Sequence, residues 1–120
     1  MTDYESLAAG YIRAWNERDP AARRAAIAEV WAADGTYTDP LIDVRGVAQI
    51  DAAIAGAQEQ FPAFVFRLTG TVDGHHSQCR FSWELGPAGA DAPVAGSDVA
   101  LVGADGRLRT VLGFLDRVPG

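Results

Sequence analysis

The feature that most constrains the fold of this chain is a change in the spacing of its apolar residues near position 64. Before this position, apolar side chains recur every three or four residues, which is typical of amphipathic helices. After it, apolar and polar side chains alternate, which is typical of strands with one buried face. Helices in the first half and strands in the second predict an α+β domain, in which the helices pack on one side of a curved, mostly antiparallel sheet.

Three helices are expected in the first half of the chain. The first has one apolar face, which is made by Tyr4, Leu7, Ala8, Tyr11, Ile12 and Trp15. The second begins with Asp19 as its N-cap and Pro20 at its first position, and it ends at residues 33–35. Its inward-facing residues are Ile27, Val30 and Trp31. The third, which Pro62 closes, presents Val47, Ile50, Ile54 and Ala57 on one side.

Four longer strands are expected in the second half, after a short one that ends at "YTDP" (37–40). The first begins at Phe64, and Asp73–Gly74 has the pattern of a hairpin turn. The next strand places Cys79, Phe81, Trp83 and Leu85 on one face. Residues 94–102 and 107–116 form the last two strands around a turn at 104–106. These four strands are expected to form an antiparallel meander.

At 120 residues the chain is long enough for one core and too short for two, so residues 1–120 are expected to form a single domain. Its formal charge of −6 argues against a nucleic-acid or anionic-membrane surface, because both need clustered positive charge. The one cysteine, Cys79, cannot form an internal disulfide. The first residues lack the pattern of a signal peptide, and no apolar run approaches the roughly 20 residues that span a bilayer. A cytoplasmic protein is therefore expected.

Metal-dependent and nucleophilic-serine chemistry have little support in the sequence. The adjacent His75 and His76 would point to opposite faces of a strand and could not chelate one metal ion. No serine has a His–Asp partner pattern, and no glycine-rich loop is suited to hold phosphates. We therefore expect neither a metal nor another cofactor.

Three residues combine reactive groups with an unusual setting. Tyr11 lies on the apolar face of the first helix, so its phenol is expected to point into the core. Asp39 precedes Pro40 at a strand end, where it either forms a turn or serves as a general base on a rigid support. Asp98 stands in an otherwise apolar strand, where a buried carboxyl is costly unless it is paired or protonated. Taken singly, each of the three also has an ordinary structural explanation.

Three stretches together resemble a known superfamily in their order and spacing: "YIRAWNERD", "WAADGTYTDPLIDVRG" and "GSDVALVGADGRLRTVLGF". They are similar to the nuclear-transport-factor-2-like (NTF2-like) superfamily, and within it to the SnoaL-like and ketosteroid-isomerase-like groups. The similarity covers nearly the whole chain. It implies a cone, in which three helices pack on a strongly curved sheet and enclose a pocket.

The resemblance also implies roles for the three residues. Steroid isomerases of this superfamily carry a tyrosine in the first helix, an aspartate before a proline and a second aspartate in a late strand, which match Tyr11, Asp39 and Asp98. Asp39 would remove a proton from the carbon beside a carbonyl, while Tyr11 and a protonated Asp98 would donate to the enolate oxygen. Further phenols of those enzymes would fall near Trp31 and Ile54, which carry no hydroxyl, so a steroid is not the expected substrate.

The hypothesis from the sequence is a cofactor-free acid/base enzyme, of the isomerase or polyketide-cyclase type, that acts on a small hydrophobic carbonyl compound. The candidate substrate-binding residues are Trp15, Trp31, Phe81, Trp83 and Leu115. One alternative is a non-catalytic module of the same superfamily that binds small molecules or dimerises. Another is an epoxide hydrolase, in which Arg45, Arg67 or Arg109 would complete an Asp–Arg–Asp arrangement. The resemblance also implies a homodimer, formed through the outer face of the sheet, which carries Arg67, Gln78, Arg80 and Glu84.

Overall fold

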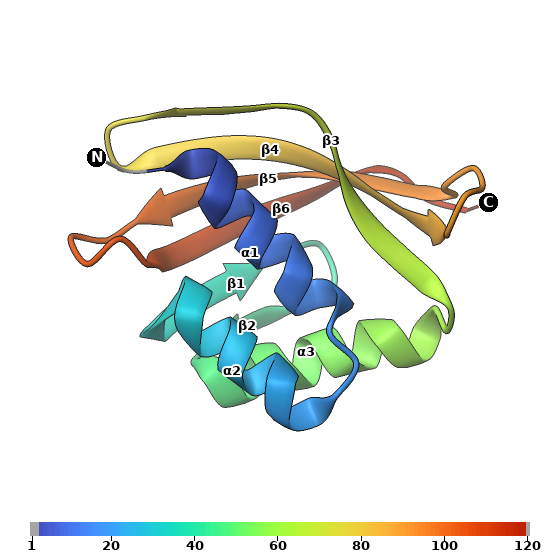
Figure 1. Cartoon of the computed structure of the whole chain (residues 1–120), viewed down its shortest axis with the longest axis horizontal. Helices are drawn as coiled ribbons and strands as arrows, with labels where there is room; N and C mark the ends of the chain where they lie inside the picture. Colours follow the sequence, from blue (N-terminus) through green and yellow to red (C-terminus); the bar gives the residue numbers. More distant parts are fainter. Residues whose placement is uncertain (1–2, 120) are drawn as a thin grey trace.

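The computed structural model describes residues 3–119, which form one six-stranded sheet with three helices against one of its faces (Figure 1). The helices are α1 (Tyr4–Asn16), α2 (Pro20–Val30) and α3 (Val47–Gln60). The strands are β1 (Trp31–Thr38), β2 (Asp43–Arg45), β3 (Phe64–His75), β4 (Gln78–Pro87), β5 (Val94–Val102) and β6 (Leu108–Arg117). The expected α+β architecture is confirmed.

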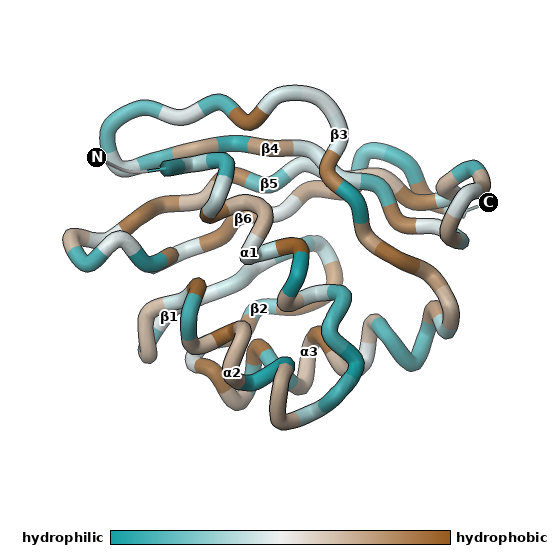
Figure 2. The backbone as a smooth tube through the Cα atoms, viewed as in Figure 1, coloured by the Kyte–Doolittle hydropathy of each residue, from teal (hydrophilic) through white to brown (hydrophobic). Residues whose placement is uncertain are grey.

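The strand order in the sheet is β2–β1–β6–β5–β4–β3. The predicted meander of β3 to β6 is antiparallel throughout, and β1 joins it as a parallel neighbour of β6. Strand β3 bends sharply where its pairing with β4 shifts between Thr69 and Asp73, because an irregularity of this kind curves a strand. The first half of β3 is mostly hydrophobic and lies near α3, whereas the second half is mostly polar (Figure 2).

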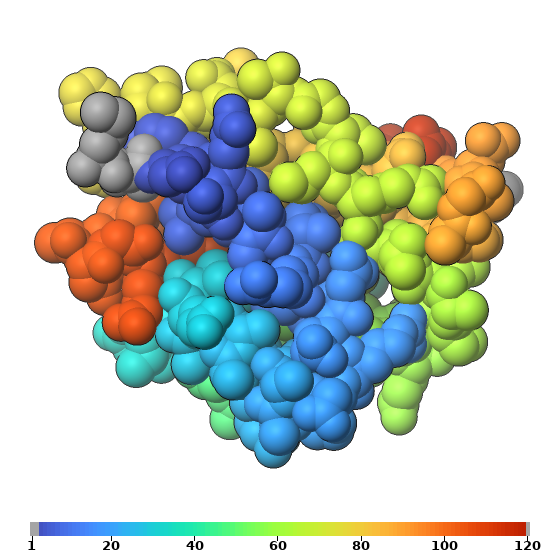
Figure 3. Space-filling view, viewed as in Figure 1, coloured from blue at the N-terminus to red at the C-terminus, as the bar shows by residue number. Residues whose placement is uncertain are grey.

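Both predicted helix starts rest on side-chain caps. Asp3 accepts a hydrogen bond from the Ser6 N–H, and Asp19 accepts one from the Ala22 N–H with Pro20 at the first helical position. Each cap satisfies a backbone donor that the helix itself leaves free. In the space-filling view, α1 (dark blue) crosses the middle of the molecule and α2 (lighter blue) lies below it (Figure 3).

A buried polar network joins the three helices beside the core. The Arg23 side chain on α2 donates from Nε to Asp51 on α3 over 2.6 Å and from Nη1 to Gln58 over 3.0 Å. Gln58 in turn donates to the backbone carbonyls of Trp15 and Glu17 at the end of α1. The sequence pattern did not predict this network. It fixes α3 relative to the helix that carries Tyr11.

Three local predictions were wrong. Helix α2 ends at Val30, so Trp31 begins β1, which is longer than the predicted strand. The short strand β2, which pairs with the end of β1, was not anticipated. The hairpin turn lies at residues 76–77, where His76 has a φ of 53°, and not at Asp73–Gly74.

Gly74 has a packing role that explains the misplaced turn. It pairs with Cys79 inside the β3–β4 ladder, and the ring of Tyr4 covers it so closely that an added Cβ would lie 2.5–2.7 Å from ring atoms. The Tyr4 hydroxyl donates to the carbonyl of His76 over 2.6 Å. A glycine at this place permits close approach of a ring rather than a reversal of the chain.

No helix in the part of the chain from residue 3 to residue 119 combines the length and the hydropathy required to cross a membrane.

Candidate active site

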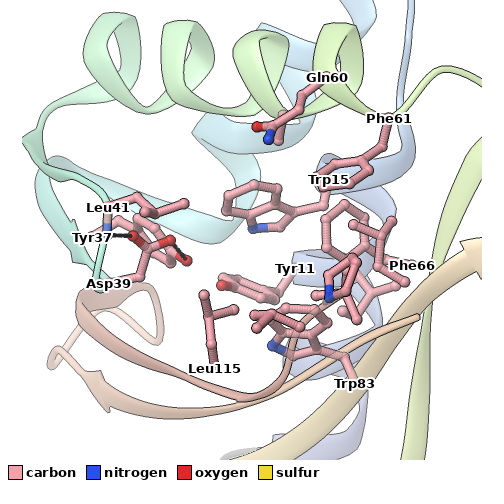
Figure 4. Close-up of a pocket in the computed structure, with 16 residues that line it drawn as sticks. Tyr11, Trp15, Tyr37, Asp39, Leu41, Gln60, Phe61, Phe66, Trp83 and Leu115 are labelled. Atoms are coloured by element: carbon pink, nitrogen blue, oxygen red, sulfur yellow. Dashed lines mark hydrogen bonds between the residues drawn. The ribbon is translucent and has the colours of Figure 1, made fainter. Parts of the chain in front are cut away.

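An apolar cavity of about 280 Å³ lies between the helices and the inner face of the sheet (Figure 4). Its apolar and aromatic lining residues are Tyr11, Ile12, Trp15, Tyr37, Leu41, Ala57, Phe61, Phe66, Trp83, Leu85, Val94, Leu115, Val118 and Pro119. Asp39 and Gln60 are the other two lining residues. No basic side chain lines the cavity among residues 3–119, so its only formal charge is negative. Mostly apolar walls with a few polar groups are typical of sites that bind small molecules.

Tyr11 and Asp98 form a buried pair beside this cavity. The Tyr11 hydroxyl donates to Oδ2 of Asp98 over 2.6 Å, and the Asp98 side chain is almost fully buried, with 1% of its residue surface exposed. The second carboxyl oxygen of Asp98, Oδ1, is buried and has no hydrogen-bond partner. Asp98 faces the core because alternation along β5 places it on the same side as Val94 and Ala100.

Burial raises the pKa of Asp98 to about 6. The hydrogen bond from Tyr11 and the nearby Trp83 indole lower this pKa, whereas the charges of Asp39 and Asp116 raise it. Burial and then the charge of Asp98 raise the pKa of Tyr11 well above its ordinary value, so the phenol stays protonated and remains a donor. Of the two groups, the carboxyl group therefore titrates closer to neutral pH, and the phenol keeps its proton.

Asp39 lies on the cavity wall at the end of β1, where three donors fix the orientation of its carboxyl group. Oδ1 accepts the backbone N–H groups of Leu41 at 2.8 Å and Ile42 at 3.0 Å, which makes a tight turn after the strand. Oδ2 accepts the hydroxyl of Tyr37 over 2.7 Å. Both roles considered for Asp39 are thus compatible with its position: it forms a turn, and its half-buried carboxyl group reaches the cavity.

Gly113 on β6 shows how closely the two tyrosine–carboxylate pairs approach each other. A Cβ added at Gly113 would lie 2.9 Å from Oδ1 of Asp98, 3.2 Å from the Tyr37 hydroxyl and 3.3 Å from Cβ of Asp39. The Asp98 carboxyl group, the Tyr37 hydroxyl and the β-carbon of Asp39 therefore surround one glycine. A larger residue there would occupy the space in which they meet.

The structure places some predicted binding residues on the cavity wall and others behind it. Trp15, Trp83 and Leu115 line the cavity. Trp31 and Phe81 do not line it; each packs against the Tyr11 ring, with ring centroids 5.1 Å apart. These two residues hold the phenol in place from behind.

Tyr37 is the site residue that sequence reasoning missed. Its ring is buried, it lines the cavity and its hydroxyl binds Asp39. Burial, followed by the charges of Asp98 and Asp39, raises the pKa of this phenol and keeps it protonated. Strand alternation could have found it, because residues two positions apart in a strand share a face and Tyr37 precedes Asp39 by two.

The arginine required by the epoxide-hydrolase alternative is not at the site. Arg67 binds Glu84 and two backbone carbonyls at the other side of the sheet, and Arg45 contacts the carbonyl of Asp34. Arg109 is exposed on β6. None of the three lines the cavity, so the structure does not form an Asp–Arg–Asp arrangement.

Three helices packed on a strongly curved sheet around an internal cavity define the NTF2-like class of α+β folds. Within this class, the chain belongs to the family of SnoaL-like domains, whose model matches residues 8–111. No curated protein sequence matches the chain significantly.

Solved structures support the same assignment. A protein from Agrobacterium tumefaciens, provisionally named an isomerase of the SnoaL-like family, is 40% identical; the match covers 97% of this chain and 99% of that one, with a TM-score of 0.91. A SnoaL-like protein of unknown function from Burkholderia thailandensis is 19% identical over 93% of both chains, with a TM-score of 0.73. A protein from Sinorhizobium meliloti, provisionally named a polyketide cyclase, is 16% identical over 90% of this chain and 93% of that one, with a TM-score of 0.70. The last two likenesses concern the fold alone.

Proposed function

We propose that the protein is a cofactor-free acid/base enzyme that moves a proton at the carbon beside the carbonyl group of a small hydrophobic compound. The observation that carries this proposal is a pair of tyrosine–carboxylate contacts, Tyr11–Asp98 and Tyr37–Asp39, at one apolar cavity. Tyr11, Tyr37 and Asp39 line this cavity, and Asp98 is buried next to it, where it accepts from Tyr11. Two carboxyl groups in different settings are suited to opposite tasks. Asp98 is almost fully buried, whereas Asp39 lies half-buried on the cavity wall.

In the proposed step, the ionised Asp39 carboxylate accepts a proton from the carbon beside the carbonyl. The electron pair of the broken C–H bond forms a carbon–carbon double bond, and the carbonyl π electrons move onto oxygen to give an enolate. The Tyr11 phenol, with the protonated form of Asp98 next to it, stabilises the charge on that oxygen. The proton on Asp39 then returns to another carbon, which gives an isomer. Alternatively, the enolate carbon forms a bond to a second carbonyl carbon and closes a ring; the π electrons of that carbonyl move onto its oxygen, which takes up the proton from Asp39.

The names of the structural neighbours are compatible with either outcome. The Agrobacterium protein is provisionally named an isomerase, and the Sinorhizobium protein is provisionally named a polyketide cyclase. Isomerisation and aldol ring closure begin with the same enolate, so one arrangement of base and donors serves both.

The proposed substrate is neutral and small. The cavity volume of about 280 Å³ is at the lower end of the range for ligand sites. An anionic group would find no cationic partner among the described lining residues and would meet the charge of Asp39. We therefore expect one- or two-ring ketones to bind better than carboxylates or phosphate esters.

The test is the exchange of the acidic C–H protons of 2-tetralone, a two-ring ketone, with D₂O, followed by NMR. The protein is expected to accelerate exchange, and Asp39→Asn is expected to lower the rate about 100-fold or more while the ketone still binds. Asp43→Asn serves as the control, because Asp43 is an exposed carboxylate on the adjacent strand β2 and binds Thr38 rather than the cavity.

Equal rates for the wild type and Asp39→Asn would remove Asp39 from the mechanism. Tight binding of 2-tetralone without any acceleration of exchange would instead favour the non-catalytic binding module.

We also propose that the protein forms a homodimer through the outer face of the sheet, opposite the helices (Figure 1). Arg67 and Glu84 on this face form an ion pair within the chain, as do Arg80 and Asp73, which reduces their availability for pairing between subunits. The apolar residues Leu112 and Phe114 are exposed on β6 and offer a hydrophobic contact, since Phe114 is 58% exposed.

Light scattering coupled to size-exclusion chromatography tests the dimer. Phe114→Lys is expected to shift the mass from dimer to monomer. Val118→Lys is the control, because Val118 is equally exposed but lies at the cavity. A monomeric wild type would contradict the proposal.

A further inference from the structure

The hydroxyl protons of both tyrosines at the site are already used in hydrogen bonds. The Tyr11 hydroxyl donates to Asp98, and the Tyr37 hydroxyl donates to Asp39. A phenol has one proton to donate. While both carboxyl groups are ionised, neither phenol can therefore donate to an oxygen atom of a ligand without giving up its carboxylate.

The Trp15 indole N–H lies near the Tyr11 hydroxyl and lowers the pKa of that phenol, but no hydrogen bond joins the two groups. This Nε1–H is buried without a hydrogen-bond partner, and Trp15 as a residue is only 6% exposed. The ring lies on the cavity wall, and contacts with Tyr37 and Phe66, each at a centroid distance of 5.3 Å, fix its orientation. Figure 4 shows the indole nitrogen on the edge of the ring that faces the Tyr11 hydroxyl, with the Asp39 carboxyl group across the cavity.

The other two tryptophans do not offer an equivalent group. Trp31 Nε1 is also buried without a partner, but Trp31 lies behind Tyr11 and does not line the cavity. The Trp83 Nε1 is not among the buried nitrogen atoms without a partner, and its indole lies near Asp98, whose pKa it lowers. A buried N–H without a partner costs free energy, and a ligand that supplies an acceptor recovers it.

We propose that the Trp15 Nε1–H donates a hydrogen bond to the carbonyl oxygen of the ligand. The polar end of the ligand then lies between Trp15 and Asp39, with its ring system against the aromatic wall. The inference rests on the proposed function only in the choice of a ketone as the ligand. If turnover takes place, the same N–H faces the oxygen on which negative charge grows.

The first experiment compares 2-tetralone with tetralin, which has the same two-ring skeleton without the oxygen. The three tryptophans give three indole cross-peaks in a ¹H–¹⁵N spectrum, and tryptophan-to-phenylalanine variants assign them. We expect the Trp15 cross-peak to move downfield with 2-tetralone and not with tetralin. An unchanged Trp15 signal, or tetralone binding no tighter than tetralin, would overturn the inference.

The second experiment removes the donor and keeps the aromatic packing. In Trp15→Phe, the ratio of 2-tetralone affinity to tetralin affinity is expected to fall about three- to tenfold, which corresponds to one hydrogen bond to a neutral acceptor. Trp31→Phe is the matched control, because it removes an unpartnered indole N–H that packs on the same tyrosine outside the cavity. An equal fall in both variants, or none in Trp15→Phe, would contradict the proposal.

If Trp15→Phe does not fold, 3-benzothienylalanine at position 15 replaces the N–H with sulfur at nearly constant shape, and the same ratio is measured.

Neither experiment needs turnover. If the Trp15 cross-peak moves with 2-tetralone but the protein does not accelerate the exchange of tetralone protons, only the enzyme proposal is overturned. If the Trp15 cross-peak does not move with 2-tetralone but Asp39→Asn abolishes proton exchange, only the Trp15 proposal is overturned.

Discussion

The hydroxyl of Tyr11 on the first helix donates to the carboxyl group of Asp98 on the fifth strand over 2.6 Å, although 87 positions separate the two residues in the sequence. This contact gives a buried carboxyl group one partner and leaves its other oxygen without one. An incompletely satisfied acid is costly to the fold when it ionises. The arrangement therefore links the stability of the protein to the protonation of a group at the candidate active site.

Asp98 should make the protein less stable as the pH rises from about 4 to about 6. Its pKa is about 6 in the folded state against an ordinary value of 3.8, so folding is favoured while the group is protonated, and that contribution is lost as the pH rises through the folded pKa. Since one pH unit corresponds to about 1.4 kcal/mol, the loss is about 3 kcal/mol. Urea unfolding at several pH values measures it.

Asp98→Asn is the reference for this experiment, because the amide oxygen can still accept the Tyr11 hydroxyl but cannot ionise. The free energy of unfolding of the wild type relative to this variant should fall by about 3 kcal/mol across the interval. A constant difference between pH 4 and pH 7 would show that Asp98 does not titrate there.

Tyr37→Phe should weaken both the fold and the proposed reaction. The change removes the phenol that binds Oδ2 of Asp39 and leaves the two backbone donors on Oδ1. We expect a loss of about 1–3 kcal/mol in the free energy of unfolding. The rate of 2-tetralone proton exchange should fall, but less than in Asp39→Asn, since the base itself remains.

Tyr4→Phe is the control for this prediction. It also removes a phenolic hydrogen bond, which joins Tyr4 to the His76 carbonyl far from the cavity, so it should lower stability without changing the exchange rate. Equal effects of the two variants on exchange would argue against a role for Tyr37 at the site.

Gly113→Ala should disturb the candidate site directly. The new methyl group would lie 2.9 Å from Asp98 Oδ1 and 3.2 Å from the Tyr37 hydroxyl, and buried neighbours cannot move away freely. We expect a loss of about 1–3 kcal/mol in stability, together with weaker binding of 2-tetralone. Gly56→Ala is the matched control on α3, where an added Cβ meets nothing within 4 Å.

The Gly56→Ala control should be more stable than the wild type by about 0.5–1 kcal/mol, because alanine favours a helix over glycine. Thermal unfolding and ligand titration of both variants separate the two effects. Unchanged tetralone binding in Gly113→Ala would mean that the ligand does not depend on the groups around this glycine.

Arg23→Ala should cost far more stability than Arg24→Ala. Both arginines approach Asp51, but the Arg23 side chain is 7% exposed and binds at 2.6 Å, whereas Arg24 is 54% exposed at 3.8 Å. Removing Arg23 leaves the mostly buried Asp51 carboxylate with only the exposed Arg24 as a partner at 3.8 Å, and should cost about 3 kcal/mol. Removing the exposed one should cost about 1 kcal/mol or less. Similar losses in chemical unfolding would mean that the network joining the helices contributes little.

Local patterns in the sequence account for much of the fold. The Asp19 cap before Pro20 and the apolar spacing of all three helices predict these elements, because such signals act within a few residues. Alternation along β4 predicts which of its side chains share the buried face, whereas β5 carries apolar residues on both faces, so its pattern leaves the burial of Asp98 open. The same reasoning failed at Gly74, whose role depends on the ring of Tyr4 from a distant helix.

The sequence by itself thus determined the three helices, the four longer strands, the buried faces of the helices and of β4, and the identity of three candidate residues, since those properties follow from local backbone preference and apolar spacing. Only the tertiary structure decided which polar groups meet. Two features depend on how α1 crosses the sheet: the Tyr11–Asp98 pair and the position of the Trp15 indole. The distance between the Tyr37–Asp39 pair and Asp98 depends on the strand order, in which β6 lies between β1 and β5. Contacts of this kind join residues far apart in the chain, and they form only when the helices and the sheet pack to exclude water from the same cavity.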